Sequence, residues 1–139
     1  MFYQNKQTKE ILTRQEMLKQ FREEYDGGDD TNILNYTEYY LEVFQTFEEL
    51  GQVVQTKGLY SAVEHNPEAQ REVIEAFTKY KAMDWGDLND HDKELNDKAI
   101  KYKNDRVLAK YHIESLNRNI YIITEWDRSV TTLLFTDEY

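Results

Sequence analysis

Acidic side chains gather in one stretch of the sequence, and carboxylates can hold hard metal ions or act as acids and bases. The acids of this stretch are Asp84, Asp87, Asp90, Asp92, Glu94 and Asp97. A calcium loop needs a glycine at its sixth position and a bidentate Glu at its twelfth, whereas Gly86 is third from Asp84. The stretch is more typical of a solvated helix start, where the helix dipole favours acids.

Other metal and catalytic signatures are missing from the sequence. His65, His91 and His112 are scattered, and no cysteine is present, so a zinc site would need carboxylates to complete it. There is no HExxH, P-loop, GxSxG or Rossmann glycine pattern. We therefore predict no catalytic residue, no metal and no cofactor, and we expect the chain not to be an enzyme.

The stretch from Glu125 to Ser129 brings together two acids, an arginine and a hydroxyl, with Trp126, Asp127 and Arg128 between its ends. Such a set is compatible with a small metal-dependent nuclease that uses Glu125, Asp127 and Arg128 on guide RNA or DNA. It is also compatible with an ordinary turn, in which Asp bonds the backbone and Arg pairs with an acid. Both interpretations stay open at this point, and the turn is favoured.

A second acidic group accompanies an apolar repeat. Residues spaced alternately four and three apart predict a helix from about Tyr36 to Lys57; they are Tyr36, Tyr40, Val43, Phe47, Leu50 and Val54. On the opposite face of that helix, Glu38, Glu42 and Glu49 would lie about 6 and about 10.5 Å apart along the axis. This spacing roughly matches nucleic-acid phosphates and is also that of a plain solvated face.

The remaining elements follow from local signals. We predict a hairpin over 1–12, a helical part over 13–82, and a helix plus antiparallel strands over 83–139. The signals are the capping box Thr13-Arg14-Gln15-Glu16, the loop Asp26–Asp30, Asn66-Pro67 at a helix start, a helix from Asn89 or Asp90, and strands near 106–113, 119–126 and 130–135. The fold class is therefore α+β, with N-terminal helices packed on a three- or four-stranded antiparallel sheet in a single domain.

Charge and composition narrow the functional class. The formal net charge of −10 opposes binding to free nucleic acid or to anionic lipid, and it favours a basic partner. No apolar stretch is long enough to span a membrane, and the first residues lack the apolar run of a signal peptide. We therefore expect a cytoplasmic protein with a protein partner.

The C-terminal part carries a joint pattern. It comprises Asp84-Trp85-Gly86-Asp87, Asn96-Asp97-x-Ala99, Arg106-Val107-Leu108-x-x-Tyr111, and Ile122 to Phe135 with the central Thr124-Glu125-Trp126-Asp127-Arg128-Ser129, ending Glu138-Tyr139. Over about residues 84–139, this pattern resembles a family of small plasmid- and mobile-element-encoded proteins of Gram-positive bacteria. Small acidic proteins on such elements include anti-CRISPR proteins of type II systems, so the resemblance implies an inhibitor of an RNA-guided nuclease.

We therefore predict a protein that binds a type II RNA-guided nuclease, or its guide complex, and blocks nucleic-acid engagement at a basic channel. The alternatives are the nuclease described above and a non-enzymatic regulator or adaptor of a mobile element. The residues expected to contact the partner are Glu38, Glu42, Glu49, Asp84, Trp85, Asp87, Trp126, Asp127 and Arg128.

Overall fold

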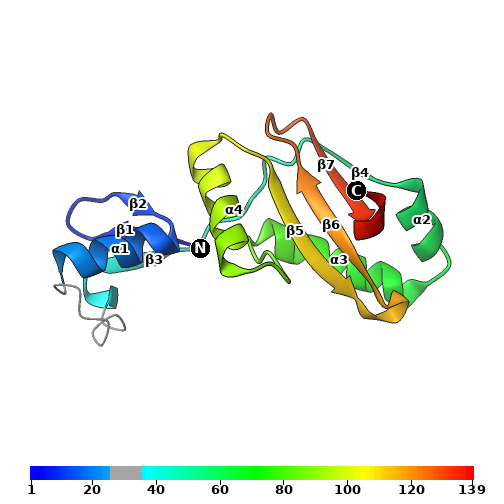
Figure 1. Ribbon diagram of the computed structural model, residues 1–139, viewed down its shortest axis with the longest axis horizontal. Helices are drawn as coiled ribbons and strands as arrows, with labels where there is room; N and C mark the ends of the chain where they lie inside the picture. The colour runs from blue at the N-terminus through cyan, green and yellow to red at the C-terminus, as the bar shows by residue number, and fades with distance from the viewer. Residues whose placement is uncertain (26–35) are drawn as a thin grey trace. The chain divides into compact units, whose positions relative to one another are not determined.

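Residues 1–25 and 36–139 are described by the computed structural model, and the loop predicted at Asp26–Asp30 lies outside these residues. The contacts divide the chain into two compact units, Met1–Gln45 and Thr46–Tyr139, and each unit is described by itself (Figure 1). The single domain expected from the sequence stays a prediction.

The first unit is a small antiparallel sheet with one helix. Its elements are β1 (Phe2–Asn5), β2 (Ile11–Leu12), α1 (Arg14–Glu24) and β3 (Tyr40–Val43), with the strands in the order β2-β1-β3. The predicted hairpin is confirmed as β1 and β2. The capping box is also confirmed, since Thr13 Oγ1 accepts from Glu16 N and Glu16 Oε1 accepts from Thr13 N.

Aromatic side chains fill the core of this unit. Its buried members are Tyr3, Leu12, Met17, Phe21 and Tyr40. Asn5 is fully buried, and its Oδ1 accepts from the backbone N–H groups of two residues in the hairpin turn, Gln7 and Thr8. A buried polar group needs such partners, and here they fix the hairpin turn.

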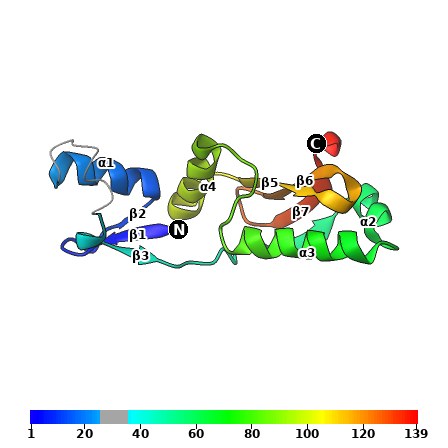
Figure 2. The same ribbon diagram turned by 90° about the horizontal axis from the view of Figure 1, so that it is seen from below.

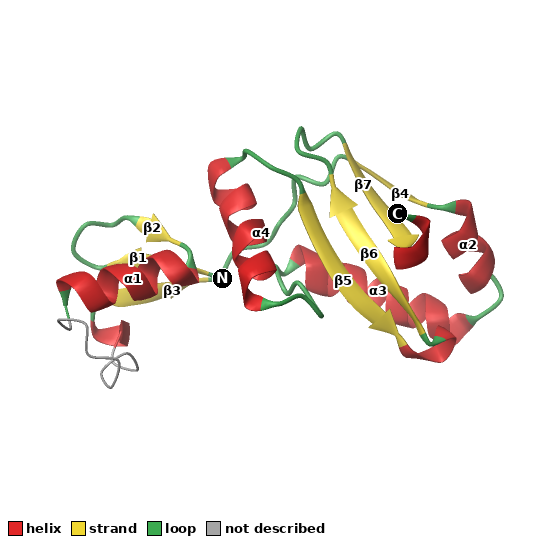
Figure 3. Ribbon diagram, in the orientation of Figure 1, coloured by secondary structure: helices red, strands yellow, loops and turns green. Residues whose placement is uncertain are grey.

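The second unit packs helices on a four-stranded sheet (Figure 3). Its elements are β4 (Gln52–Gln55), α2 (Lys57–Val63), α3 (Pro67–Lys81), α4 (Asp90–Tyr102), β5 (Val107–Ile113), the 3-10 turn η2 (Glu114–Leu116), β6 (Arg118–Thr124), β7 (Val130–Phe135) and the 3-10 turn η3 (Thr136–Glu138). Asn66 caps α3, with Pro67 as its first residue, and Asn89 caps α4, so both predicted helix starts are confirmed.

The sheet has the order β4-β7-β6-β5. β5, β6 and β7 form the predicted antiparallel meander, and β4 adds a fourth strand parallel to β7. Figure 2 shows α3 along one face of this sheet. On that face Tyr80 from α3 shares a 2.7 Å hydrogen bond with Thr124, and Thr124 shares another of 2.7 Å with Thr131. These buried bonds join the helix to two strands.

The helix predicted from Tyr36 to Lys57 is wrong, because the segment forms β3 and β4 with an irregular connection between them. Pairing with distant strands decides the local structure: Val43 lies opposite Phe2, and Val53 lies opposite Thr131. Gly51, between the two strands, has φ +62, and a Cβ there would collide with the Ser129 carbonyl. A continuous helix cannot satisfy these contacts.

The fold is α+β as predicted, whereas the predicted order of helices first and sheet last holds only in part. Strands lie at the N-terminus and within the region 13–82 that was expected to be helical, and the fourth strand of the larger sheet is parallel. Within the described ranges, no helix combines the length and the apolar character needed to cross a bilayer.

Candidate functional site

The Asp84–Asp87 loop is held tightly against β5. The hydroxyl of Tyr111 donates to the Asp84 carbonyl at 2.6 Å, and the N–H of Asp87 donates to the Lys110 carbonyl at 2.8 Å. Gly86 has φ +70, and a Cβ at this position would collide with the Lys110 carbonyl. The glycine of the motif is therefore required by close backbone approach, while the Asp84 and Asp87 side chains are exposed.

Trp85 belongs to the core of the second unit and has only 2% of its surface exposed. Its ring lies edge-on to Tyr80 and Phe47, and its Nε1–H donates to Asp97 Oδ1 at 2.9 Å. The sequence placed Trp85 at a partner surface, but this structure leaves its side chain no accessible area for such a contact.

Asp97 and Asn96 from α4 complete this arrangement. Burial raises the pKa of the Asp97 carboxyl above its ordinary value, and the bond from Trp85 opposes that rise only in part. Asn96 donates to the Leu108 carbonyl at 2.8 Å and accepts from the Leu108 N–H at 3.1 Å, so its side chain continues the ladder of β5. The acids and amides of the motif thus build the fold.

The turn from Glu125 to Ser129 connects β6 and β7. Arg128 extends its guanidinium to three backbone carbonyls, those of Asp105 at 2.7 Å, Ala99 at 2.9 Å and Glu125 at 3.2 Å. Ala99 lies in the last turn of α4, where carbonyls lack helical partners. Arg128 therefore fastens the turn to the end of the helix, which is a structural role.

Asp127 and Trp126 occupy the exposed tip of this turn. Asp127 Oδ1 accepts from the Ser129 N–H at 3.0 Å, and bonding to Ser129 lowers the pKa of the Asp127 carboxyl. This is the Asx geometry of a turn. Trp126 is 67% exposed and remains available to a partner.

The proposed face of Glu38, Glu42 and Glu49 does not exist as a helical surface. Glu38 lies in a 3-10 turn and Glu42 in β3, both in the first unit, whereas Glu49 precedes β4 in the second. Glu49 is 3.3 Å from Lys103 Nζ, and Glu42 accepts from the Tyr36 hydroxyl at 3.0 Å. The phosphate-like spacing inferred from the sequence is therefore wrong, because the helix that carried it is absent.

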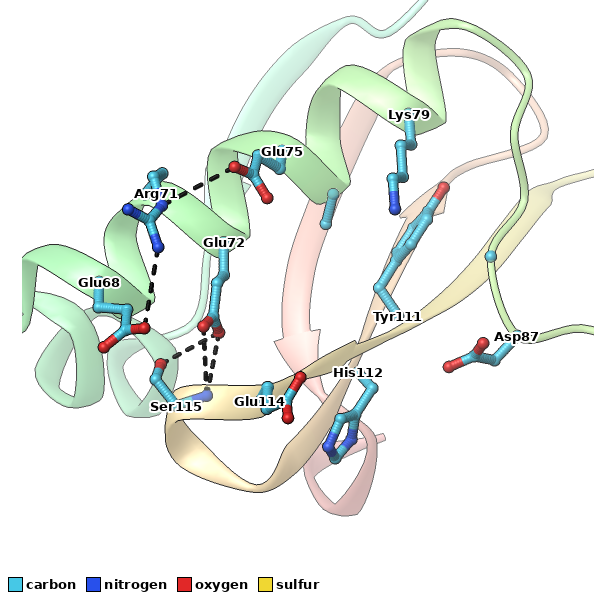
Figure 4. A pocket seen from close by; sticks show the side chains of 12 residues that line it. Glu68, Arg71, Glu72, Glu75, Lys79, Asp87, Tyr111, His112, Glu114 and Ser115 are labelled. Atoms are coloured by element: carbon cyan, nitrogen blue, oxygen red, sulfur yellow. Dashed lines mark hydrogen bonds and ion pairs between the residues drawn. The ribbon is translucent and has the colours of Figure 1, made fainter.

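The structure instead forms a polar groove that the sequence did not predict (Figure 4). Its volume is about 610 Å³, and it lies between the outer flank of α3 and the end of β5 with its following turn. The charged and polar side chains that line it are Glu68, Arg71, Glu72, Glu75, Lys79, Asp87, Tyr111, His112, Glu114 and Ser115.

Carboxylates outnumber cations in this groove. The five acids are Glu68, Glu72, Glu75, Asp87 and Glu114, and the two cations are Arg71 and Lys79. Arg71 lies between Glu68 and Glu75, at 3.8 Å from each, in exposed ion pairs that hold it only weakly. The groove therefore presents an excess of negative charge to solvent.

One acid of the groove has a structural task. Glu72 accepts from both the N–H and the hydroxyl of Ser115, at 3.2 and 3.0 Å, and so ties α3 to η2. The other four carboxylates are exposed. Arg and Lys side chains of a partner are the groups that such carboxylates bind best.

A helical signal for this groove was present in the sequence. Glu68, Glu72 and Glu75 are spaced four and three apart, so they share one flank of α3. The apolar residues Val73, Phe77 and Tyr80 form a different stripe of the same helix. The approach of η2 to the helix depends on the sheet and could not be inferred locally.

In the ranges that the structure describes, no three His, Asp or Glu side chains are placed to hold a metal ion. His112, at the edge of the groove, shares a 2.7 Å hydrogen bond between its Nδ1 and Asn119 Oδ1.

Comparisons with family models, curated proteins and solved structures found no match for this chain.

Proposed function

We propose that this protein is an anti-defence inhibitor that binds a type II RNA-guided nuclease in the cytoplasm of a bacterial host and hinders nucleic-acid engagement. The observation that carries the proposal is the groove beside α3, with five carboxylates against two cations in about 610 Å³. Nucleases of this class hold their heteroduplex in a positively charged channel. An acidic concave surface complements the basic side chains of such a channel.

Three further observations support binding over catalysis. Arg128, the cation of the suggested nuclease set, is engaged by three backbone carbonyls. Asp127 lies at an exposed turn tip with its carboxylate bonded to Ser129. The net charge of −10 also disfavours the approach of free DNA or RNA, the substrate of a nuclease.

The test is a binding titration against several type II nuclease orthologues, each with and without its guide RNA. The groove variant combines Glu68→Gln, Glu75→Gln and Glu114→Gln. The control variant combines Glu38→Gln, Glu49→Gln and Glu125→Gln, which removes the same charge from other surfaces. Each lost rim charge is worth about 0.5 kcal/mol, so the groove variant is expected to bind about tenfold more weakly than the control.

Salt provides an independent check, because the Debye length falls from about 10 Å at 0.1 M to about 3 Å at 1 M. Affinity for the nuclease is expected to fall with added salt more steeply for the wild type than for the groove variant. Failure to bind any orthologue would sink the proposed function. If both triple variants bind with equal affinity, the nuclease remains the partner but the contact lies on another surface of the protein. Trp126→Ala is then the next variant to test.

A further inference from the structure

Among the residues that the structure describes, no strand pairs with the outer edge of β4. Gln52 N donates to the Ser129 carbonyl at 3.1 Å and Thr56 N donates to the Leu133 carbonyl at 3.0 Å, so alternate residues of β4 turn toward β7. Residues between them turn the other way in a parallel ladder. The N–H and C=O groups of Val53 and Gln55 therefore face outward, where β4 is the edge strand of the sheet.

This edge strand is short, and it carries neither the charges nor the proline that often protect a free edge. From Leu50 to Thr56 the sequence has no charged residue and no proline. Natural edge strands are commonly shielded by Lys, by Pro or by a bulge, since an open edge pairs with other strands. Val53 is 46% exposed on the edge itself. An uncharged, open edge is suited to strand addition.

An apolar groove runs beside the same edge. It has a volume of about 220 Å³ and is lined by Val53, Val54, Gln55, Val73, Ile74, Phe77 and Leu133. Ile74 of α3 is 64% exposed in its wall. The acidic groove lies along Glu72, Glu75 and Lys79 of the same helix, so α3 separates a charged groove from an apolar one.

In an added strand, the residues that bond to the backbone of Val53 and Gln55 are the same residues whose side chains would enter the apolar groove. Val53 and Gln55 lie opposite Thr131 and Leu133, on the face of the sheet that α3 covers. In antiparallel pairing, residues that exchange both backbone bonds lie directly opposite each other and project to the same face. The two residues bonded to Val53 and Gln55 would therefore also fill the apolar groove.

We propose that the β4 edge binds an extended, uncharged peptide segment of a partner protein, with large apolar side chains at two alternate positions. The segment would add a fifth strand to the sheet and place those side chains against Ile74 and Phe77. This interaction is separate from the charge-driven contact proposed above, because its surface is neutral and lies on the other flank of α3.

A short segment fits the edge better than a second copy of the chain. β4 has four residues, about 13 Å of strand, and a strip of that length about 10 Å deep offers on the order of 130 Å². A stable dimer needs about 600 Å² or more from each copy. Two antiparallel β4 strands would also place Gln55 of one copy opposite Val53 of the other, which adds a second amide to the groove that Gln55 of the same chain already lines.

The experiment uses blocked seven-residue peptides, Ser-Thr-X-Thr-X-Thr-Ser, in which X is Leu, Ile, Val, Met, Phe or Tyr in turn. Binding is followed by NMR of the full chain, with amide exchange rates at Val53 and Gln55. At least one peptide is expected to bind with a Kd near or below about 1 mM. Saturation is expected to slow exchange of these two amides by at least about tenfold.

Matched controls separate strand addition from unspecific apolar contact. Ile74→Lys is expected to weaken binding about tenfold or more, whereas Leu95→Lys, at a site 49% exposed on α4, is expected to leave it unchanged. N-methylation of both X residues should abolish binding, because it removes the N–H groups that pair with Val53 and Gln55.

Several results would overturn the assignment. They are no binding by any peptide, equal binding by the N-methylated form, or equal binding by Ile74→Lys. Without peptide, the amides of Val53 and Gln55 could become more protected from exchange as the protein concentration rises. If the molecular mass also doubles, the edge binds a second copy of the chain instead.

Discussion

Replacing Arg128 by Lys tests whether this arginine holds the fold or serves a site. The guanidinium donates to the carbonyls of Asp105 and Glu125 through Nη1 and to that of Ala99 through Nη2, whereas an ammonium has all of its donors on one atom and cannot reproduce this fork. A hydrogen bond from a charged group contributes about 1.5–3 kcal/mol. Arg128 is half-buried, so each bond should contribute a value near the lower end of this range. Loss of two of the three bonds therefore predicts a decrease of about 2–4 kcal/mol in the free energy of unfolding.

The assay is urea unfolding, followed by helical circular dichroism and by tryptophan fluorescence, which reports on buried Trp85. Arg71→Lys is the matched control, since Arg71 is exposed and forms only 3.8 Å ion pairs. Its expected change is within about 0.5 kcal/mol. If Arg128→Lys proves as harmless as this control, the carbonyl contacts do not hold the turn, and Arg128 returns as a candidate functional cation.

Three further predictions concern the core, a buried acid and metal ions. Phe47→Ala is expected to lower the unfolding free energy by about 3–5 kcal/mol, because Phe47 is only 3% exposed. Phe44→Ala is expected to change it little, because Phe44 is 80% exposed. Similar losses for the two variants in urea unfolding would contradict the burial of Phe47. The folded-state pKa of Asp97 is raised by burial, so its carboxyl favours the fold below the unfolded pKa of about 4 and loses that contribution as pH rises through the folded pKa. The control is Asp97→Asn, whose amide oxygen can still accept from Trp85. The unfolding free energy of the wild type relative to this variant should therefore increase from pH 7 to pH 3. A difference that does not change with pH would argue against the raised pKa. The melting temperature is expected to be unchanged by EDTA, because no metal-holding group is present among the residues that the structure describes; a fall of more than about 4 °C would point to a bound ion.

Local signals were enough to place most helices and strands. The hydroxyl of Thr13, the amide of Asn66 and that of Asn89 each accept the backbone bond that starts a helix, and such caps act over three residues. The meander strands were equally visible, because β-branched and aromatic residues fill them and short turns join them. These features depend on neighbours in the chain.

The error at Tyr36–Lys57 came from a pattern that was regular but not decisive. Alternating four- and three-residue spacing is satisfied by apolar residues in two short strands as well as in a helix, and pairing with β1 and β7 decided between them. Phe47 is nevertheless buried, against Tyr80 and Trp85. The apolar pattern therefore predicts the burial of Phe47 correctly and its secondary structure wrongly.

The candidate site was predicted less well than the fold. Trp85 and Arg128 looked like contact residues because aromatic and arginine side chains are common at interfaces. Inside the second unit, however, Trp85 donates to Asp97, and Arg128 donates through both terminal nitrogens to backbone carbonyls. Whether a polar residue of a motif serves the fold or a partner depends on what surrounds it, and that information is not local in the sequence.

The parallel pairing of β4 with β7 affects how the protein folds during synthesis. Gln52 leaves the ribosome long before Val130, its partner in the sheet. At about 5–20 residues per second, β4 waits for several seconds with both edges open and with the apolar flank of α3 uncovered. Such distant pairing also slows folding through its high contact order. The nascent chain is therefore exposed to aggregation and to capture by chaperones until the last strand emerges.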